Sequence, residues 1–249
     1  MNIDFPTLTQ IPALKQLYQA AFGDTNAQTQ LFFSTAFSPH RCRCLTQSGS
    51  VAAALYWFDC RDEQGKIAYL YAVATDPAFR GQGLCHRLME DTHSLLAEQG
   101  YRAAILVPGS ESLFSFYATM GYQSLNCMDT LCFTAGDPVP ITALSPEAYA
   151  EKRRHYLPQG GVIQEEENLT YLSGMARFFA GENFLLACDP NGSDLIGLEL
   201  LGQAQNASGV LAALDIKEGR FRTPGTSPFA MFKMLNLSPP PAYFGLALD

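Results

Sequence analysis

The sequence predicts a mixed α/β fold, in which one sheet carries helices on both of its faces. Two observations lead to this prediction. The expected elements run in the order helix, helix, strand hairpin, and then strand–helix–strand–helix–strand, which gives a sheet of mixed strand direction. Hydrophobic residues make up 47% of the 249 positions and charged residues only 16%, which is sufficient for a packed core and excludes a globally disordered chain.

The helices of the first part are predicted from apolar stripes, and the strands from short apolar runs. Leu14, Leu17 and Tyr18 lie on one face of the first helix, and Gly23 follows as its C-terminal stop. The turn 48–50 between two apolar runs indicates a hairpin. In order, the expected elements are helices at 9–23 and about 26–36, strands at 42–47, 50–60 and 67–75, a helix at about 82–98, a strand at 101–107, a short helix at 110–120, and one or two strands within 122–133.

A second part of the chain is predicted after a linker. Residues 133–146 contain three prolines and a glycine, so we place a first domain at 1–136 and a smaller α+β domain at 140–249. Both parts begin with the same order of elements, which is helix, helix, strand, turn and strand. The second part is therefore either a degenerate copy of the first or an unrelated domain. Its expected elements are helices at 145–157 and 166–180, strands at 184–189 and 195–202 around a turn at 190–194, a helix at 208–216, and strands at 219–225, 228–235 and 243–249.

Charge, hydropathy and cysteine content narrow the classes of function. The net charge is −8 and basic residues cluster only at 41–43 and 151–154, so the chain lacks the basic face of a nucleic-acid-binding protein. No apolar run approaches the roughly 18 residues of a membrane span. Seven cysteines, an odd number, and an N-terminus without a basic stretch before an apolar core favour a cytoplasmic protein with reduced thiols. Cys42 and Cys44 have no second Cys or His pair nearby, so we expect no metal site.

The short segment Arg80–Cys85 carries the strongest functional signal. It joins the predicted strand 67–75 to the predicted helix 82–98, and it contains Gly81 and Gly83. A helix N-terminus presents backbone N–H groups without internal partners and the positive end of the helix dipole. Glycines remove the side chains that would keep a phosphate away from those N–H groups, and an arginine can add a charge-assisted contact. Taken alone, however, the segment also fits an ordinary helix start.

A second motif supports the functional interpretation, and the span 67–122 resembles the core of the GCN5-related N-acetyltransferase (GNAT) family. The central motif of that family, Gln/Arg-x-x-Gly-x-Gly/Ala, is matched by Arg80–Cys85, with a cysteine in the place of the last glycine or alanine. Its later motif, a helix carrying a tyrosine and followed by a Gly-aromatic pair, is matched by Tyr117 and Gly121–Tyr122.

This resemblance covers roughly residues 1–135 and implies both a fold and a site. The fold is a mostly antiparallel sheet whose central strands, here 67–75 and 102–107, splay apart around an acyl-coenzyme A. The donor is expected to be acetyl-CoA, with its pantetheine arm paired to strand backbone and its pyrophosphate on the glycine turn. Tyr117 occupies the position of the family's general acid, which protonates the departing thiolate. The implied donor-binding residues are Val73, Ala74, Thr75, Arg80, Gly81, Gln82, Gly83, Leu84, Cys85 and Ser110.

Two departures from the family pattern bear on the mechanism. Ser110 stands seven residues before Tyr117, where many relatives have an asparagine that faces the cofactor. The strand 67–75 carries no glutamate, although relatives often carry their general base on this strand. The remaining sources of a base are a water relay, a group of the second part, Asp59, Glu111, or the terminal carboxylate at Asp249.

The sequence therefore predicts an N-acyltransferase that moves an acetyl group from acetyl-CoA to a primary amine of a small molecule or peptide. Direct attack in a ternary complex is favoured, because no Cys–His or Ser–His pair indicates an acyl-enzyme. The second part is expected to shape the acceptor side. The alternative is a non-catalytic acyl-CoA-binding or regulatory module, which the two departures favour. A Rossmann-type nucleotide-binding protein fits less well, because the turn lacks the third fingerprint glycine and follows a hairpin. Nothing in the sequence indicates an oligomeric state.

Overall fold

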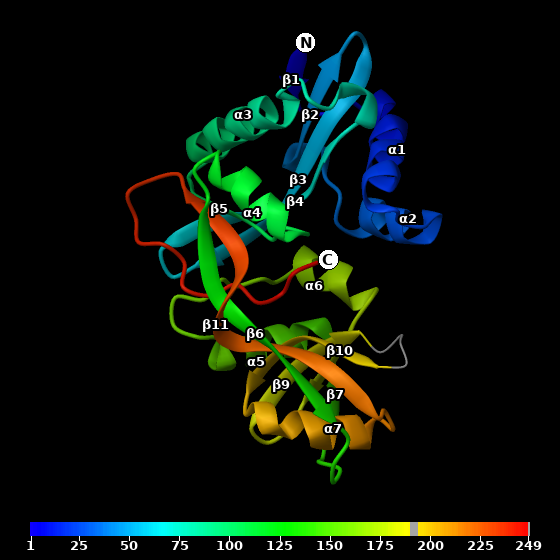
Figure 1. Ribbon diagram of the computed structural model, residues 1–249, viewed down its shortest axis with the longest axis vertical. Helices are drawn as coiled ribbons and strands as arrows, with labels where there is room; N and C mark the ends of the chain where they lie inside the picture. The colour runs from blue at the N-terminus through cyan, green and yellow to red at the C-terminus, as the bar shows by residue number, and fades with distance from the viewer. Residues whose placement is uncertain (190–193, 249) are drawn as a thin grey trace.

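A computed structural model describes residues 1–189 and 194–248 of the chain. The strands are β1 (Asn2–Asp4), β2 (Cys42–Gln47), β3 (Ser50–Asp62), β4 (Gly65–Thr75), β5 (Tyr101–Leu106), β6 (Gln123–Thr134), β7 (Thr142–Leu144), β8 (Arg177–Ala180), β9 (Phe184–Asp189), β10 (Leu195–Gly202) and β11 (Glu218–Met234). The α-helices are α1 (Ile11–Phe22), α2 (Asn26–Thr35), α3 (Leu84–Glu98), α4 (Glu111–Ala118), α5 (Pro146–Tyr156), α6 (Glu167–Ser173) and α7 (Ala207–Ala213). The strands join one sheet in the order β1-β2-β3-β4-β5-β11-β10-β9-β8-β7, and β6 pairs with β11 beside that path (Figure 1).

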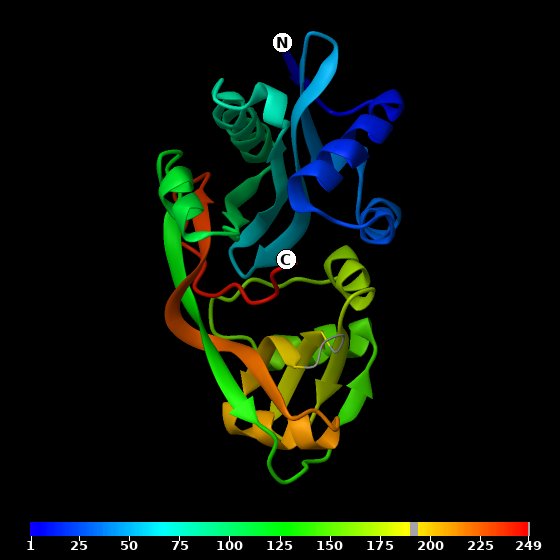
Figure 2. The same cartoon turned by 45° about the vertical axis from the view of Figure 1, so that its right-hand side comes forward.

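The first half of the molecule has helices on both faces of a mostly antiparallel sheet, which confirms the predicted fold class. α1 and α2 cover one face, and α3 and α4 cover the other (Figures 1 and 2). Each face has its own apolar core. Leu14, Tyr18 and Phe32 belong to the core under α1 and α2, whereas Leu88 and Tyr117 belong to the core under α3 and α4. The spacing of four between Leu14 and Tyr18 places both side chains on the buried stripe of α1.

Local signals predict most elements of this half within a few residues. Strand 42–47 is found as predicted. The helix expected at about 82–98 begins at Leu84, because Gly83 adopts a left-handed conformation with φ 71° and precedes the first helical turn. The sequence does not predict β1, whose three residues depend on pairing with β2.

The long strand β11 joins the two halves of the sheet. Its first residues pair in parallel with β10, as in Leu195 with Gly219. Its last residues pair antiparallel with β5, as in Met231 with Leu106, and β6 runs along most of its length (Figures 1 and 2). The prediction of two separate strands here was wrong. Pro224 and Pro228, which cannot donate a ladder hydrogen bond, flank an irregular register instead of ending the strand.

The second half corrects one further prediction. The helix expected at 166–180 ends at Ser173, and Arg177–Ala180 forms strand β8. The apolar run 175–180 continues a helical pattern in sequence, but in the fold β8 pairs with β9 on one side and β7 on the other. The tight turn predicted at 190–194 falls largely on residues 190–193, which lie outside the described residues.

The last part of the chain returns to the first half. The prediction of a strand at 243–249 was wrong for its described residues, which make only an isolated bridge between Gly161 and Tyr243. Instead, this segment is held by scattered hydrogen bonds, including Val162 N to Tyr243 O at 2.8 Å and Leu248 N to the Tyr69 hydroxyl at 3.1 Å. Its end lies between the two halves (Figures 1 and 2). The division into domains at 1–136 and 140–249 stays a prediction. No helix among the described residues is both long and apolar enough to span a membrane.

Candidate active site

The parallel ladder between β4 and β5 covers nearly all of β5 but only the first part of β4. The parallel ladder runs from Lys66 opposite Tyr101 to Tyr69 opposite Ile105. Beyond that point β4 contains a bulge, in which Ala72 and Val73 together oppose one residue of β3 and Ala72 has a φ of 51°. Beyond Ile105 the two strands no longer pair, which agrees with the splay that the family resemblance implies and leaves an edge of β4 on which an extended ligand could pair.

The glycine turn Arg80–Gly83 presents backbone amides at the start of α3. Gly81 and Gly83 have φ values of 77° and 71°, which side chains other than glycine rarely adopt. No side chain caps the helix. A Cβ atom built on either glycine would have nothing within 4 Å, so no neighbouring atom crowds these two positions. Positive φ, and not crowding, therefore requires glycine at both positions, and the amides are available to an anion.

Two side chains hold the turn against neighbouring strands. The Arg80 guanidinium donates from Nε to the Thr75 carbonyl oxygen at 3.2 Å, which links the turn to the end of β4. The Gln82 amide oxygen accepts from Gln47 Nε2 at 3.0 Å. The predicted donor-binding segments 73–75 and 80–85 thus lie together.

Tyr117 lies in the apolar core beneath α3 and α4 and is 7% exposed. Its ring contacts those of Phe116 and Tyr122, with centroids 5.4 and 5.8 Å away. Burial raises the pKa of the Tyr117 phenol, and the nearby Cys85 raises it further. Cys85 is itself half-buried, and burial raises its pKa to about 11, so its thiol is neutral near pH 7. The structure therefore brings the predicted acid and the turn together, while Ser110 lies at the start of α4 with its hydroxyl 3.1 Å from that of Ser112.

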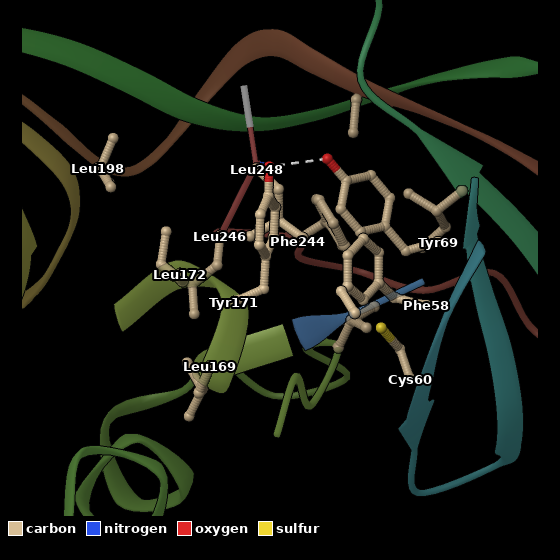
Figure 3. Close-up of a cluster of buried hydrophobic side chains, with 14 of the residues drawn as sticks. Phe58, Cys60, Tyr69, Leu169, Tyr171, Leu172, Leu198, Phe244, Leu246 and Leu248 are labelled. Carbon is tan, nitrogen blue, oxygen red and sulfur yellow. Dashed lines mark hydrogen bonds between the residues drawn. The ribbon is translucent and has the colours of Figure 1, made fainter. Parts of the chain in front are cut away.

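A cavity of about 920 Å³ opens beside the splay. Ala72 of β4 and Val107, just after β5, both line it, so it reaches the point where the two strands diverge. Leu172 and Leu198 contribute from the second half. Figure 3 shows Leu172 and Leu198 on the left, and Leu248, whose backbone N–H donates to Tyr69, between them and Tyr69. The cavity therefore lies between the two halves of the molecule.

Three tyrosine hydroxyls form a hydrogen-bonded row at the wall of this cavity. The Tyr71 hydroxyl is 2.8 Å from that of Tyr18 and 3.0 Å from that of Tyr171. Burial raises the pKa of all three phenols, so they are neutral. Sequence reasoning assigned Tyr18 only to an apolar stripe and missed this cluster. The alternation of Tyr69 and Tyr71 places both rings on one face of β4, but it does not point to Tyr18 or Tyr171.

Asp59 and Glu111, two of the carboxylates considered as a general base, do not line the cavity. Asp59 accepts hydrogen bonds from the Tyr101 hydroxyl and from Arg41. Glu111 is exposed in the first turn of α4. Among the described residues, the cavity is instead lined by the carboxylates of Asp24 and Asp189. Asp249 lies outside the described residues.

No metal site is evident in residues 1–189 and 194–248, where no three His, Cys, Asp or Glu side chains are grouped to hold an ion. All seven cysteines are free thiols.

Comparison with known families agrees with this arrangement. Residues 2–125 match the model of the acetyltransferase (GNAT) domain. The first half of this chain is a GNAT domain. A comparison with curated proteins gave no significant match.

Solved GNAT structures share the fold over nearly the whole chain, the second half included. A GCN5-related N-acetyltransferase from Anabaena variabilis superposes with a TM-score of 0.74 at 13% identity, covering 95% of this chain and 73% of that one. A GCN5-related N-acetyltransferase from Kribbella flavida superposes with a TM-score of 0.72 at 15% identity, covering 94% of this chain and 70% of that one. A GCN5-related N-acetyltransferase from Sphaerobacter thermophilus superposes with a TM-score of 0.57 at 13% identity, covering 97% of this chain and 98% of that one. At these identities the likeness establishes the fold alone.

Proposed function

We propose that this GNAT protein is an N-acyltransferase that moves an acetyl group from acetyl-CoA to a primary amine. One observation carries the proposal. Arg80 joins the glycine turn, whose amides have no side-chain cap among the described residues, to the open edge of β4. That edge ends at a cavity large enough for a second substrate. A cosubstrate with a long arm and a diphosphate would fit this path, because the arm and the diphosphate need an edge and an amide-rich turn respectively.

On the donor side, the amides from Gly81 to Cys85 would hold the pyrophosphate, with the exposed Arg80 and Gln82 beside it. The pantetheine arm would pair with the backbone of Val73, Ala74 and Thr75. Leu84 is 3% exposed and anchors the first turn of α3 in the core. Ser110 takes the place of the asparagine that is common in the family and offers a hydroxyl near the same cleft.

The transfer would proceed by direct attack within a ternary complex. A neutral amine nitrogen bonds to the thioester carbonyl carbon, and the carbon–sulfur bond breaks after the addition. The proton that the nitrogen gives up would pass to a water relay, which returns a proton to Tyr117. The backbone N–H near Val73, at the bulge of β4, would stabilise the oxyanion. The Tyr117 phenol, which is protonated because burial raises its pKa, would donate its proton to the departing thiolate.

The acceptor side would be shaped by both halves of the molecule. Tyr18 and Tyr71 line the cavity from the GNAT domain, and Tyr171, Leu172 and Leu198 line it from the second part. The proposed role of residues 140–249 is therefore to close the acceptor pocket. The acceptor would be a small molecule or a peptide, since about 920 Å³ is within the range of small-ligand pockets.

Coenzyme A release over a panel of primary amines tests the proposal, with Tyr117→Phe as the diagnostic variant. We expect release with at least one amine, and a kcat about 100-fold lower in Tyr117→Phe because the leaving thiolate loses its acid. The acetyl-CoA Kd, measured by calorimetry, should be unchanged and serves as the internal control. Tight acetyl-CoA binding without release on any amine would instead support the non-catalytic binding module. Unchanged turnover in Tyr117→Phe would remove this residue from the mechanism.

A further inference from the structure

We propose that the hydroxyls of Tyr18, Tyr71 and Tyr171 hold the reacting amine of the acceptor, and that the site selects a primary amine on an apolar body without a neighbouring carboxylate. This inference rests on the proposed acyltransferase function and names the substrate class of the same site. It is carried by the hydroxyl row, by its place on β4, and by the character of the cavity wall.

The hydroxyl row has hydrogen-bonding capacity to spare. Two hydrogen bonds join the three hydroxyls, at 2.8 and 3.0 Å. The Tyr18 and Tyr171 hydroxyls also interact with each other. Each hydroxyl has one hydrogen and two lone pairs, so even when all three hydrogens are used within the row, several lone pairs are left for a ligand. A neutral phenol oxygen can accept from an ammonium or from an amine N–H, whereas a buried apolar wall would leave those groups unpaired.

The row is also placed correctly for attack. Tyr71 directly precedes the bulge residue Ala72, and both line the cavity. An amine held at the Tyr71 hydroxyl would therefore lie on the cavity side of the strand whose next residues are proposed to hold the thioester. The rings are fixed by packing, since Tyr18 stacks on Phe32 at 5.2 Å and Tyr171 lies 5.6 Å from the same ring. Fixed rings hold the hydroxyls in position without an ordering cost on binding.

The wall of the cavity favours a cation with an apolar body. Asp24 lines the cavity, and its charge contributes to the raised pKa values of Tyr18 and Tyr171, after the larger effect of burial. No Lys, Arg or His occurs among the described lining residues. Most of the residues that line the cavity are aromatic or aliphatic, such as Leu31, Val107 and Met175. An ammonium would be attracted here, whereas a substrate carboxylate would face a like charge and find no cation to pair with.

A matched pair of substrates tests the selectivity. 2-Phenylethylamine and phenylalanine share the amine and the aromatic body, and they differ by the α-carboxylate. We expect kcat/KM for 2-phenylethylamine to be at least about 10-fold higher, because the carboxylate of phenylalanine would enter an unpaired and repelled position. Equal values, a preference for phenylalanine, or acetylation of other amines without 2-phenylethylamine would overturn the substrate class.

A matched pair of variants tests the hydroxyl row. Tyr71→Phe should raise KM for the amine about 10- to 100-fold while leaving KM for acetyl-CoA unchanged, because one or two hydrogen bonds to a charged group are lost. Tyr56→Phe is the control. Its hydroxyl is buried without a hydrogen-bond partner in the described part of the chain, and its ring packs 6.3 Å from that of Tyr18. If Tyr71→Phe is poorly folded by thermal melting, Tyr18→Phe serves as the second variant.

The outcomes separate the two proposals. An active wild type in which Tyr71→Phe and Tyr18→Phe behave as Tyr56→Phe does would overturn the role of the hydroxyl row and leave the acyltransferase intact. A wild type that releases no coenzyme A with any amine would overturn the acyltransferase function, and the amine site with it.

Discussion

The molecule buries one cluster of polar side chains within the second half and another where the two halves meet. The two clusters differ in whether their hydrogen-bonding groups are used up. In the second half, Glu199 is fully buried, and both of its oxygens are occupied. Arg153 donates to them from Nε at 2.7 Å and from Nη2 at 2.8 Å. The hydroxyls of Tyr149 and Tyr243 donate at 2.8 and 3.0 Å. Gly245 lies so close that a Cβ there would be 1.7 Å from Glu199 Oε1, which leaves no room for a ligand.

The tyrosine row, formed by Tyr18 and Tyr71 of the first half and Tyr171 of the second, is neutral and open to a cavity. Its hydroxyls make two hydrogen bonds among themselves and border a cavity of about 920 Å³. It contains no charge whose burial must be compensated. The closed cluster can therefore only stabilise the fold, chiefly by holding the C-terminal segment through Tyr243, whereas the open row has groups left for a substrate. Burial and hydrogen bonding alone do not tell a functional cluster from a structural one. Unused hydrogen-bonding capacity next to a cavity is what distinguishes the functional cluster from the structural one.

The largest expected effect comes from breaking the closed cluster. Glu199→Leu should lower the free energy of unfolding by about 3–5 kcal/mol, because Arg153 is left buried and uncompensated. Urea unfolding measures the loss. Arg154→Met is the control, since the Arg154–Glu165 pair is largely exposed at the arginine and its removal should leave the urea midpoint nearly unchanged. Equal effects of the two variants would show that the Glu199 cluster is not the structural one.

The buried pair of His93 and Tyr122 lies between the two clusters in its hydrogen bonding, and it predicts a pH-dependent stability. The His93 Nε2 atom is 2.8 Å from the Tyr122 hydroxyl, and Nδ1 has no partner within the described residues. Burial, and then Lys233, lower the pKa of His93 from 6.5 to about 4. The unfolded chain therefore binds this proton more readily, so stability is full above about pH 6.5 and falls as the pH drops from 6.5 to 4.

The free energy of unfolding should fall by about 3 kcal/mol between pH 6.5 and pH 4 because of His93, and this contribution should be absent in His93→Gln. Urea unfolding of both proteins at pH 7 and pH 4 measures it, because contributions shared by the other groups cancel in the difference. Parallel pH dependences in the two proteins would contradict the prediction.

The smallest expected effect on stability lies in the open row. Tyr171→Phe should lower the free energy of unfolding by about 1 kcal/mol or less, because it removes one hydrogen bond between neutral groups and keeps the ring. Tyr56→Phe, which removes a hydroxyl without a partner, should cost still less. Thermal melting of both variants checks the order. A loss for Tyr171→Phe as large as that for Glu199→Leu would make the row structural and erase the contrast between the clusters.

The elements of the first half that local signals determine could be predicted. The hairpin of β2 and β3 follows from two apolar runs around a short turn, and the glycine turn follows from Arg80–Gly83 between a strand and a helix. The helix 166–180 was predicted too long, because an apolar run that β8 uses for pairing looks the same in sequence as the continuation of α6. Only the partner strand distinguishes the two.

The tyrosine row could not be predicted for a related reason. Tyr71 is 53 residues from Tyr18 and 100 residues from Tyr171. The three come from α1, β4 and α6, and no local pattern connects these elements. Their approach depends on the second half docking beneath the GNAT domain, a result of strand order and of the long strand β11.

The sequence by itself determined where a backbone must take a left-handed conformation and offer bare amides, because that requirement is set by Gly81, Gly83 and their immediate neighbours. Only the tertiary structure decided what stands opposite those amides. A cavity wall is assembled from residues that are distant in the chain, and their contacts arise from the pairing of strands and the packing of helices, which no single stretch of sequence encodes.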